Sequence, residues 1–511
     1  MSGVRFRRRQ EVDFVIVGSG AAGGVLAKEL STAGFRVVVL EQGPYRRASD
    51  FRHDELGNFF LGELTGSPAE FPQTLRRSPD EAAQVQAFPP PLIYARGVGG
   101  SSVHFTANFW RFRPIDFNER SVLGPIAGTG LADWPLTYDE LEPYYAKVDW
   151  EIGVSGAPGP FDPPRSRPYP VPPLPVKSSG VILERGAEAL GWHAQPAPMA
   201  ILSQPHDGRP ACIQCGYCMM YGCEMNAKSS TLATMIPRAE ATGRCEVRPD
   251  STVFRVVTDD AGRVRSVLYW DADGREHEQR ARACILAANG AETARLLFMS
   301  ESSRFPDGLA NSSGNVGKYL MFNGQSYAYG LFEHPLNEYK GVQVTRIIHD
   351  FYESDPRRGF YGGGGIDARF SNGPILFALA GLPPDAPTWG ATYKRMLGEY
   401  YTHTVEINGH TTSLPLETNS ITLDPDVKDR WGRPALRVTY RDHPDDLATM
   451  TFMQARGLEL LEAAGARRTW ITPVTETSIA AHLLGTCRMG DDPRTSVVDR
   501  HHRAHDVRNL F

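Results

Sequence analysis

The stretch VDFVIVGSGAAGGVLAKELSTAGFRVVVLE, residues 12–41, decides the fold of this chain. The run VDFVIV predicts a buried parallel strand, and the glycines that follow predict a tight turn. The rest of the stretch predicts a helix and then a second strand, which ends at Glu41. Gly18, Gly20 and Gly23 let the backbone approach a pyrophosphate that rests on the helix N-terminus. Glu41 is placed to accept a hydrogen bond from a ribose hydroxyl. We therefore predict an α/β dinucleotide-binding domain, and the pattern fits FAD and NAD equally.

A second glycine-rich segment, RGVGGSSVHFTANFWRFRPIDF, occupies residues 96–117. Alone, it is typical of a turn that enters a buried helix. After a dinucleotide fingerprint, its backbone N–H groups are expected to cover the other half of the cofactor. The residues that we assign to cofactor binding here are Arg96, Gly99, Gly100, Ser101 and His104.

Composition excludes several classes of protein. The 511 residues include 54 Lys plus Arg and 59 Asp plus Glu, a net charge of −5, which excludes a polybasic nucleic-acid binder. No apolar run approaches the roughly 18 residues that span a bilayer, so we expect no direct membrane insertion. The arginines at 7–9 are not followed by the separate apolar region and cleavage site of an export signal. We expect a cytoplasmic location, or a periplasmic one by co-export with a partner.

The ordered motifs resemble those of the glucose–methanol–choline (GMC) oxidoreductases, nearest the gluconate and glucose dehydrogenase and pyranose oxidase branch. The segments that carry the resemblance are GSGAAG with Glu41, RGVGGSS, and the stretches 134–156, 283–297, 311–321 and 482–490. The resemblance implies FAD, and an alcohol or sugar carbon as hydride donor. It also implies an α/β fold, in which a Rossmann-like FAD-binding domain is combined with a discontinuous substrate domain built on an antiparallel sheet.

The expected division of the chain is discontinuous. The segments expected in the FAD-binding domain are 12–150, 206–325 and 471–511, and those expected in the substrate domain are 151–205, with a lid, and 326–470. VFRVV and RVRSVLYW, on either side of the turn DDAG, predict a pair of strands. In the family, a backbone amide near Val253 meets the adenine. HTVEIN and NSITLD predict strands of the substrate-domain sheet, and MTFMQARGLELLEAAG predicts a helix that ends at Gly465.

Alcohol oxidation needs a base for the hydroxyl proton, and histidine suits this role because its reference pKa of about 6.5 lies near neutral pH. His482 opens HLLGTCRMG and matches the family's catalytic histidine; His403 and His410 lack a supporting motif. His104 matches the position that bonds covalently to the flavin in pyranose oxidases. We favour a noncovalent His104 near the flavin ring, because Phe105 follows it where the family usually has Trp.

Four of the seven cysteines, Cys212, Cys215, Cys218 and Cys223, form the run C-x2-C-x2-C-x4-C. The run suits a single zinc site poorly and is closer to the bacterial ferredoxin pattern. Membrane-linked glucose dehydrogenases of the family carry an iron–sulfur cluster on three cysteines of a similar loop. The matching residues are Cys212, Cys218 and Cys223, with Cys215 as a fourth ligand or a bystander. Free thiols, a disulfide and zinc remain open alternatives.

The function expected from these residues is FAD-dependent oxidation of a hydroxyl of a sugar, sugar acid or glycoside, with electrons passed to an acceptor other than oxygen. An oxygen-using oxidase and an inactive flavoprotein are the alternatives. The second of these arises because the chain stops at Phe511, where family members continue, and we expect the sequence to be truncated. Expected partners are a sugar or polyol substrate and, by analogy, a small helper subunit and a cytochrome acceptor.

Overall fold

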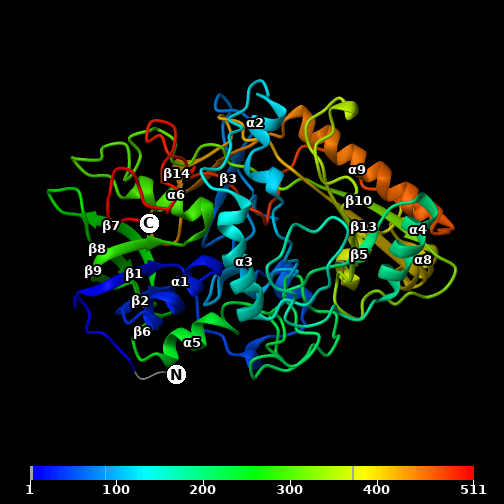
Figure 1. The fold of residues 1–511 in the computed structure, drawn as a ribbon, viewed down its shortest axis with the longest axis horizontal. Coiled ribbons are helices and arrows are strands. Elements are labelled where there is room, and N and C mark those ends of the chain that lie inside the picture. Colours follow the sequence, from blue (N-terminus) through cyan, green and yellow to red (C-terminus); the bar gives the residue numbers. More distant parts are fainter. Residues whose placement is uncertain (1–3, 87, 371–372) are drawn as a thin grey trace.

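The computed structural model describes residues 4–86, 88–370 and 373–511. A six-stranded sheet in the order β6-β2-β1-β9-β8-β7 forms one lobe, on the left of Figure 1. Its strands are β1 (Val12–Val17), β2 (Val37–Leu40), β6 (Cys245–Arg248), β7 (Thr252–Thr258), β8 (Val264–Trp270) and β9 (Glu276–Leu286). The first four strands of that order run parallel, and β7 and β8 add an antiparallel pair. The predicted strand–turn–helix–strand unit and the predicted hairpin are therefore confirmed.

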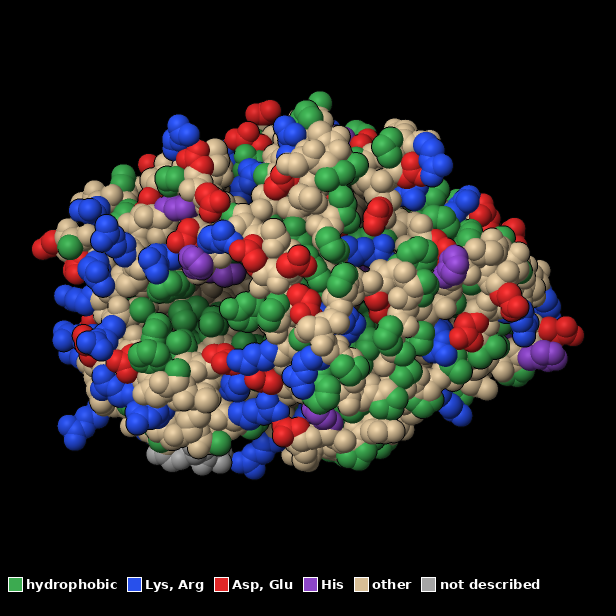
Figure 2. All heavy atoms as spheres, in the orientation of Figure 1, with side chains coloured by type: hydrophobic (Ala, Val, Ile, Leu, Met, Phe, Trp, Pro, Cys, Tyr) green, Lys and Arg blue, Asp and Glu red, His purple; other side chains and the backbone are tan. Residues whose placement is uncertain are grey.

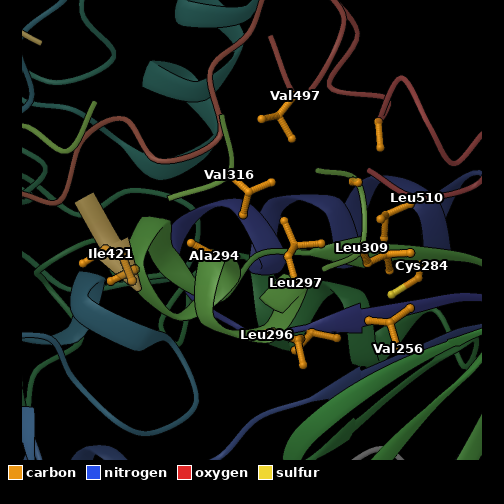
Figure 3. Packing of buried hydrophobic residues seen from close by; sticks show 14 of the residues in the cluster. Val256, Cys284, Ala294, Leu296, Leu297, Leu309, Val316, Ile421, Val497 and Leu510 are labelled. Carbon is orange, nitrogen blue, oxygen red and sulfur yellow. The ribbon is translucent and has the colours of Figure 1, made fainter. Parts of the chain in front are cut away.

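Three helices belong to this lobe: α1 (Ala21–Thr32), α5 (Met235–Ala241) and α6 (Asn289–Met299). Figure 3 shows α6 directing Leu296 and Leu297 into a cluster that also contains Val256 of β7 and Val316. Each of these side chains is almost completely buried. This burial fixes α6, and with it the loop that follows β9, against the sheet.

A second sheet, in the order β16-β10-β13-β12-β11-β5, forms the other lobe, on the right of Figure 1. Its strands are β5 (Ala194–Pro196), β10 (Gln325–Leu331), β11 (Arg346–Ile348), β12 (Gly364–Arg369), β13 (Thr404–Thr411) and β16 (Arg468–Ile471). Every neighbouring pair is antiparallel, as the family resemblance implies. Helices α4 (Ser178–Leu190) and α9 (Pro444–Ala463) pack on its apolar face, and α8 (Gly390–His403) leads into β13.

The third sheet differs from the sequence-based expectation. Strand β14 (Ser420–Lys428) contains the predicted strand NSITLD, which was expected in the substrate-domain sheet, but it forms a hairpin with β15 (Pro434–Thr439). Instead, β15 pairs in parallel with β3 (Gln73–Arg76), which pairs with β4 (Gln84–Val85). Ile421 and Val438 are buried in the same cluster as the residues of β1. The strand pattern was correct, and the assignment to a sheet was wrong.

The remaining helices are α2 (Glu119–Leu123), α3 (Tyr138–Ile152) and α7 (Pro374–Leu376), and α3 runs between the two lobes in Figure 1. Among the described residues, none of the helices combines the length and the apolar character that a bilayer crossing requires. On the face drawn in Figure 2, acidic and basic side chains are interspersed, and hydrophobic side chains line a hollow on the side of the parallel sheet.

Candidate active site

The first glycine turn leaves room for a ligand at the start of α1. Gly18 has a φ of +93°, and a Cβ added there would lie 2.5 Å from the carbonyl oxygen of Ala287. A Cβ on Gly23 would lie 2.0 Å from the carbonyl oxygen of Gly18. The helix begins after Gly20 without a side-chain cap, so no capping side chain occupies its first N–H groups. This arrangement fits a pyrophosphate.

The second glycine segment lies directly against the first. A Cβ on Gly100 would lie 2.7 Å from Cα of Gly20, and the N–H of Gly99 donates to Oγ of Ser19 at 3.1 Å. The Thr231 hydroxyl lies 3.2 Å from the Ser19 carbonyl and 3.3 Å from the Gly99 carbonyl, which joins the two turns. Sequence analysis missed Thr231, because no motif marks it.

The Glu41 carboxylate holds the same turns together. Its Oε2 accepts from the N–H of Ser19 at 3.0 Å and from the Ser19 hydroxyl at 2.7 Å. Its Oε1 accepts from the N–H groups of Gly43 at 3.1 Å and Gly97 at 3.2 Å. Burial raises the pKa of Glu41, and these hydrogen bonds oppose the rise. The contact of Glu41 with a ribose stays a prediction.

Three other predicted cofactor residues have partners within the protein. The Arg96 guanidinium donates to Gln42 at 2.5 Å and lies 3.5 Å from the centre of the Phe71 ring. The hydroxyl of Ser101 accepts from a backbone N–H at 3.1 Å. Val253 is half-buried in β7. Their contacts with a cofactor stay predictions.

The loop that carries His482 is fixed on both sides. Before it, the N–H of Ala480 donates to the Pro91 carbonyl at 2.8 Å, just ahead of the RGVGGSS segment. After it, Leu484 and Met321 exchange two backbone hydrogen bonds of 3.1 Å. The loop of His482 is therefore held between the segment that precedes RGVGGSS and the segment at Met321.

His482 is an exposed residue, and the surrounding protein and charged groups of the other lobe act on its ring. Desolvation of the ring by the surrounding protein, together with the positive charges of His410 and Arg369, lowers the pKa of His482 to about 4. The ring is therefore neutral at neutral pH, which is the form that accepts a proton. His410, which lacked a motif in the sequence, belongs to the same site.

The second sheet presents a polar face to this site. In the β12–β13 pairing, Asp367 lies opposite Asn408 and Arg369 lies opposite Glu406, so all four side chains share one face. The other face is apolar and packs on α4 and α9; its members from these two strands are Ile366, Ala368, Val405 and Ile407. Polar residues at alternate positions of central strands are unusual unless a polar ligand or network needs them.

Asp367 and Arg369 form a network with His410, which follows Asn408 by two residues on the same face of β13. Arg369 donates to both carboxylate oxygens of Asp367, through Nε at 2.7 Å and through Nη2, and Nε2 of His410 lies 2.8 Å from Oδ2 of Asp367. Burial opposes ionisation of Asp367, but the charges of Arg369 and His410 hold its pKa well below its usual range. Sequence analysis missed Asp367 and Arg369.

Trp110 connects this network to His349. Its ring meets the rings of His349 and His410 edge-on, with centroids 5.2 and 5.5 Å apart. Burial, followed by the charges of Arg113 and His410, lowers the pKa of His349 to about 3. Among the described residues, buried side-chain atoms without a partner include Trp110 Nε1, Asn323 Oδ1, His349 Nε2 and both amide atoms of Asn408. Such atoms are costly unless a ligand or water meets them.

His104 lies in the core with its Nε2 unpartnered. Burial and the neighbouring Lys228 ammonium lower its pKa to about 4. Nζ of Lys228 donates to the carbonyls of Phe105 at 3.1 Å, Cys218 at 2.6 Å and Tyr221 at 2.8 Å. Lys228 therefore ties the segment after His104 to the cysteine loop.

Comparisons with known proteins decide the family. The sequence models described as GMC oxidoreductase match residues 12–321 and 415–511. The chain belongs to the GMC oxidoreductase family. It is thus an FAD-dependent enzyme that oxidises alcohols, and the expected fold class and activity class are confirmed.

Similar GMC proteins include dehydrogenases. The chain is 33% identical to 2-methyl-1,2-propanediol dehydrogenase of Mycolicibacterium austroafricanum, over 98% of this chain and 90% of that protein. It is 30% identical to the fructose dehydrogenase large subunit of Gluconobacter japonicus, over 98% and 92%. Among solved structures, pyridoxine 4-oxidase of Mesorbium loti superposes with a TM-score of 0.65 at 18% identity, over 98% and 93%. This last likeness supports the fold alone.

The four clustered cysteines lie together but form no bonded pair. All seven cysteines of the chain are free thiols, and Cys212, Cys215, Cys218 and Cys223 line one narrow cavity. Burial raises the pKa of Cys212 to about 11 and that of Cys218 to about 12. Neither the family match nor the names of the relatives support an iron–sulfur cluster, so the cluster stays a prediction.

Proposed function

We propose that this GMC oxidoreductase oxidises a hydroxyl of a sugar, sugar acid or related polyol, with His482 as the base and with electrons passed to an acceptor other than oxygen. The polar face of the second sheet carries this proposal. It groups Asp367, Arg369 and His410 in a region where buried amide and ring nitrogens lack partners, and the charges of Arg369 and His410 act on His482. A substrate with several hydroxyl groups satisfies such a surface, whereas a simple alkyl alcohol does not.

The roles of the residues follow from their chemistry. His482 accepts the hydroxyl proton at a ring nitrogen, because its low pKa keeps the ring neutral at neutral pH. Arg369 has guanidinium donors beyond those used on Asp367, and these bind hydroxyl oxygens. FAD, when bound on the two glycine turns, takes the hydride from the substrate carbon. His104 packs beside it without a covalent bond.

The nature of the acceptor is supported by the relatives. Gluconate 2-dehydrogenase flavoprotein of Pantoea cypripedii is 28% identical over 98% of this chain and 89% of that protein. The words "large subunit" in the name of the fructose enzyme describe a component of a larger assembly. We propose by this likeness that a small helper subunit and a cytochrome accept electrons from this chain.

Anaerobic rapid mixing with a panel of aldoses, ketoses, sugar acids and 1,2-diols tests the proposal through bleaching of the flavin absorbance. We expect reduction by at least one polyhydroxylated substrate, and faster turnover with an artificial electron acceptor than with dioxygen. His482→Ala should slow flavin reduction by about 10²-fold or more, while His403→Ala serves as the matched control. Equal rates in the parent and His482→Ala proteins would remove the base assignment, and preferred turnover with dioxygen would identify an oxidase.

A further inference from the structure

The loop that contains Phe51 and His53 packs tightly on the cysteine loop. The backbone of Gly222 lies against the Phe51 ring, since a Cβ at Gly222 would lie 2.1 Å from Phe51 Cδ1. The His53 ring is stacked on the Tyr217 ring, with centroids 4.0 Å apart and planes 10° apart. Two segments that are distant in the sequence are therefore held in a fixed register, and the orientation of His53 is set by that stacking.

This contact brings three different ligand types together. One ring nitrogen of His53, Sγ of Cys215 and one carboxylate oxygen of Glu224 all lie within 4.8 Å of one another. In the part of the chain that the structure describes, this is the one group of three or more such side chains with that spacing. Nε2 of His53 lies 3.0 Å from Oε2 of Glu224, and both side chains are about 30% exposed. An ion can therefore reach the group from solvent.

We propose that His53, Cys215 and Glu224 bind one divalent cation of the zinc class. Imidazole nitrogen, thiolate sulfur and carboxylate oxygen are the three donors that zinc takes in proteins. With metal–ligand distances of about 2.0–2.3 Å, tetrahedral ligand atoms lie roughly 3.6 Å apart. The present spacing needs an inward movement of the widest pair by at most about 1 Å and a slight separation of His53 from Glu224. The fourth position is left for water.

The proposed ion has a structural consequence near the flavin site. It ties the loop at His53 to the cysteine loop, and the N–H of Met220 in that loop donates to the His104 carbonyl at 2.7 Å. The ion therefore acts as a clamp that supports the segment carrying His104. This site is distinct from the predicted cluster on Cys212, Cys218 and Cys223, because it uses only Cys215 of the run and adds ligands from outside it.

The test uses the full-length protein after removal of metal by a chelator, with Zn²⁺ or Co²⁺ added alone. We expect one zinc per chain by elemental analysis. With cobalt, we expect the thiolate-to-cobalt charge-transfer band and the visible bands of a tetrahedral site. Removing a hydrogen-bond partner of a metal ligand typically weakens binding by about 10–100-fold, so loss of a ligand in Cys215→Ser should weaken it by more than about 100-fold. His53→Ala and Glu224→Gln should each weaken it as well, and circular dichroism verifies that these variants fold.

The matched control is Cys212→Ser, which changes a thiol of the same cavity that is not a proposed ligand. It should leave both the zinc stoichiometry and the cobalt spectrum unchanged. Retention of the cobalt charge-transfer band in Cys215→Ser would overturn the proposal, as would a chain that binds no zinc. Iron with acid-labile sulfide that is kept in His53→Ala and lost in Cys212→Ser would also overturn it, and would place an iron–sulfur cluster in the loop instead.

Discussion

Replacing Lys228 by methionine tests how the buried ammonium beneath the flavin site affects stability. Lys228 is only 2% exposed, and its Nζ donates to three backbone carbonyls. Burial nevertheless lowers its pKa from 10.5 to about 8. The three hydrogen bonds therefore only partly offset the cost of removing the charge from water. Methionine retains much of the side-chain volume and removes the titration.

The magnitude follows from the pKa shift. A change from 10.5 to about 8 corresponds to about 3 kcal/mol at 1.36 kcal/mol per unit. Between these two values, the unfolded chain binds a proton that the folded chain has released, so the free energy of unfolding rises with pH in this window. Below pH 8 the cost is complete and constant. From pH 7 to pH 9.5, the parent should therefore gain about 2 kcal/mol of unfolding free energy relative to Lys228→Met.

The assay is urea unfolding of the two proteins at a series of pH values, compared as a difference. Other groups, including the buried cysteines, titrate in both proteins and largely cancel in that difference. Lys147→Met is the matched control, because the Lys147 side chain is 49% exposed where Lys228 is buried. A Lys228→Met difference that is independent of pH, or that moves in the opposite direction, would refute this reasoning.

Three further predictions concern the two lobes of the active site. Gly100→Ala should lower the FAD content of the purified protein at least about 10-fold, measured by absorbance, because its Cβ would lie 2.7 Å from the first glycine turn and its φ is +52°. Glu41→Gln should lower the free energy of unfolding by about 1–3 kcal/mol in urea, because the amide offers one acceptor oxygen where the carboxylate has two. The double variant Asp367→Asn, Arg369→Gln removes the positive charge of Arg369, which lowers the pKa of His482. The acidic limb of the pH profile of kcat/KM should therefore move upward from about pH 4. An unchanged acidic limb would contradict this.

The dinucleotide turn was predictable because its determinants are local. Gly23 is required by its contact with Gly18, and the strand, helix and acid that flank the turn lie within thirty residues. The hairpin of β7 and β8 was also local, since its two strands are joined by a short turn. In both cases, the segments that pair or pack together are close neighbours in the sequence, so a local pattern is enough to predict them.

The substrate face was not predictable in the same way. Asp367 and His410 meet because β12 and β13 pair in one particular register, and that register depends on the whole sheet. The sequence of β12 alternates polar and apolar residues, which predicts a strand with two unlike faces but not what each face meets. The assignment of β14 failed for a similar reason, because its sheet is completed by β3, which lies far earlier in the chain.

Activity alone does not distinguish a structural role of the cysteine loop from a role in electron transfer. Lys228 and the N–H of Met220 connect this loop to the segment of His104, so any substitution in the loop that shifts its backbone also shifts the flavin wall. A cysteine variant that loses turnover is therefore not proof of an electron path. If Cys212→Ser slows reduction of the flavin by substrate, the cause is displacement of His104. If reduction is unchanged and only reoxidation by a protein acceptor slows, the thiol lies on the route by which electrons leave.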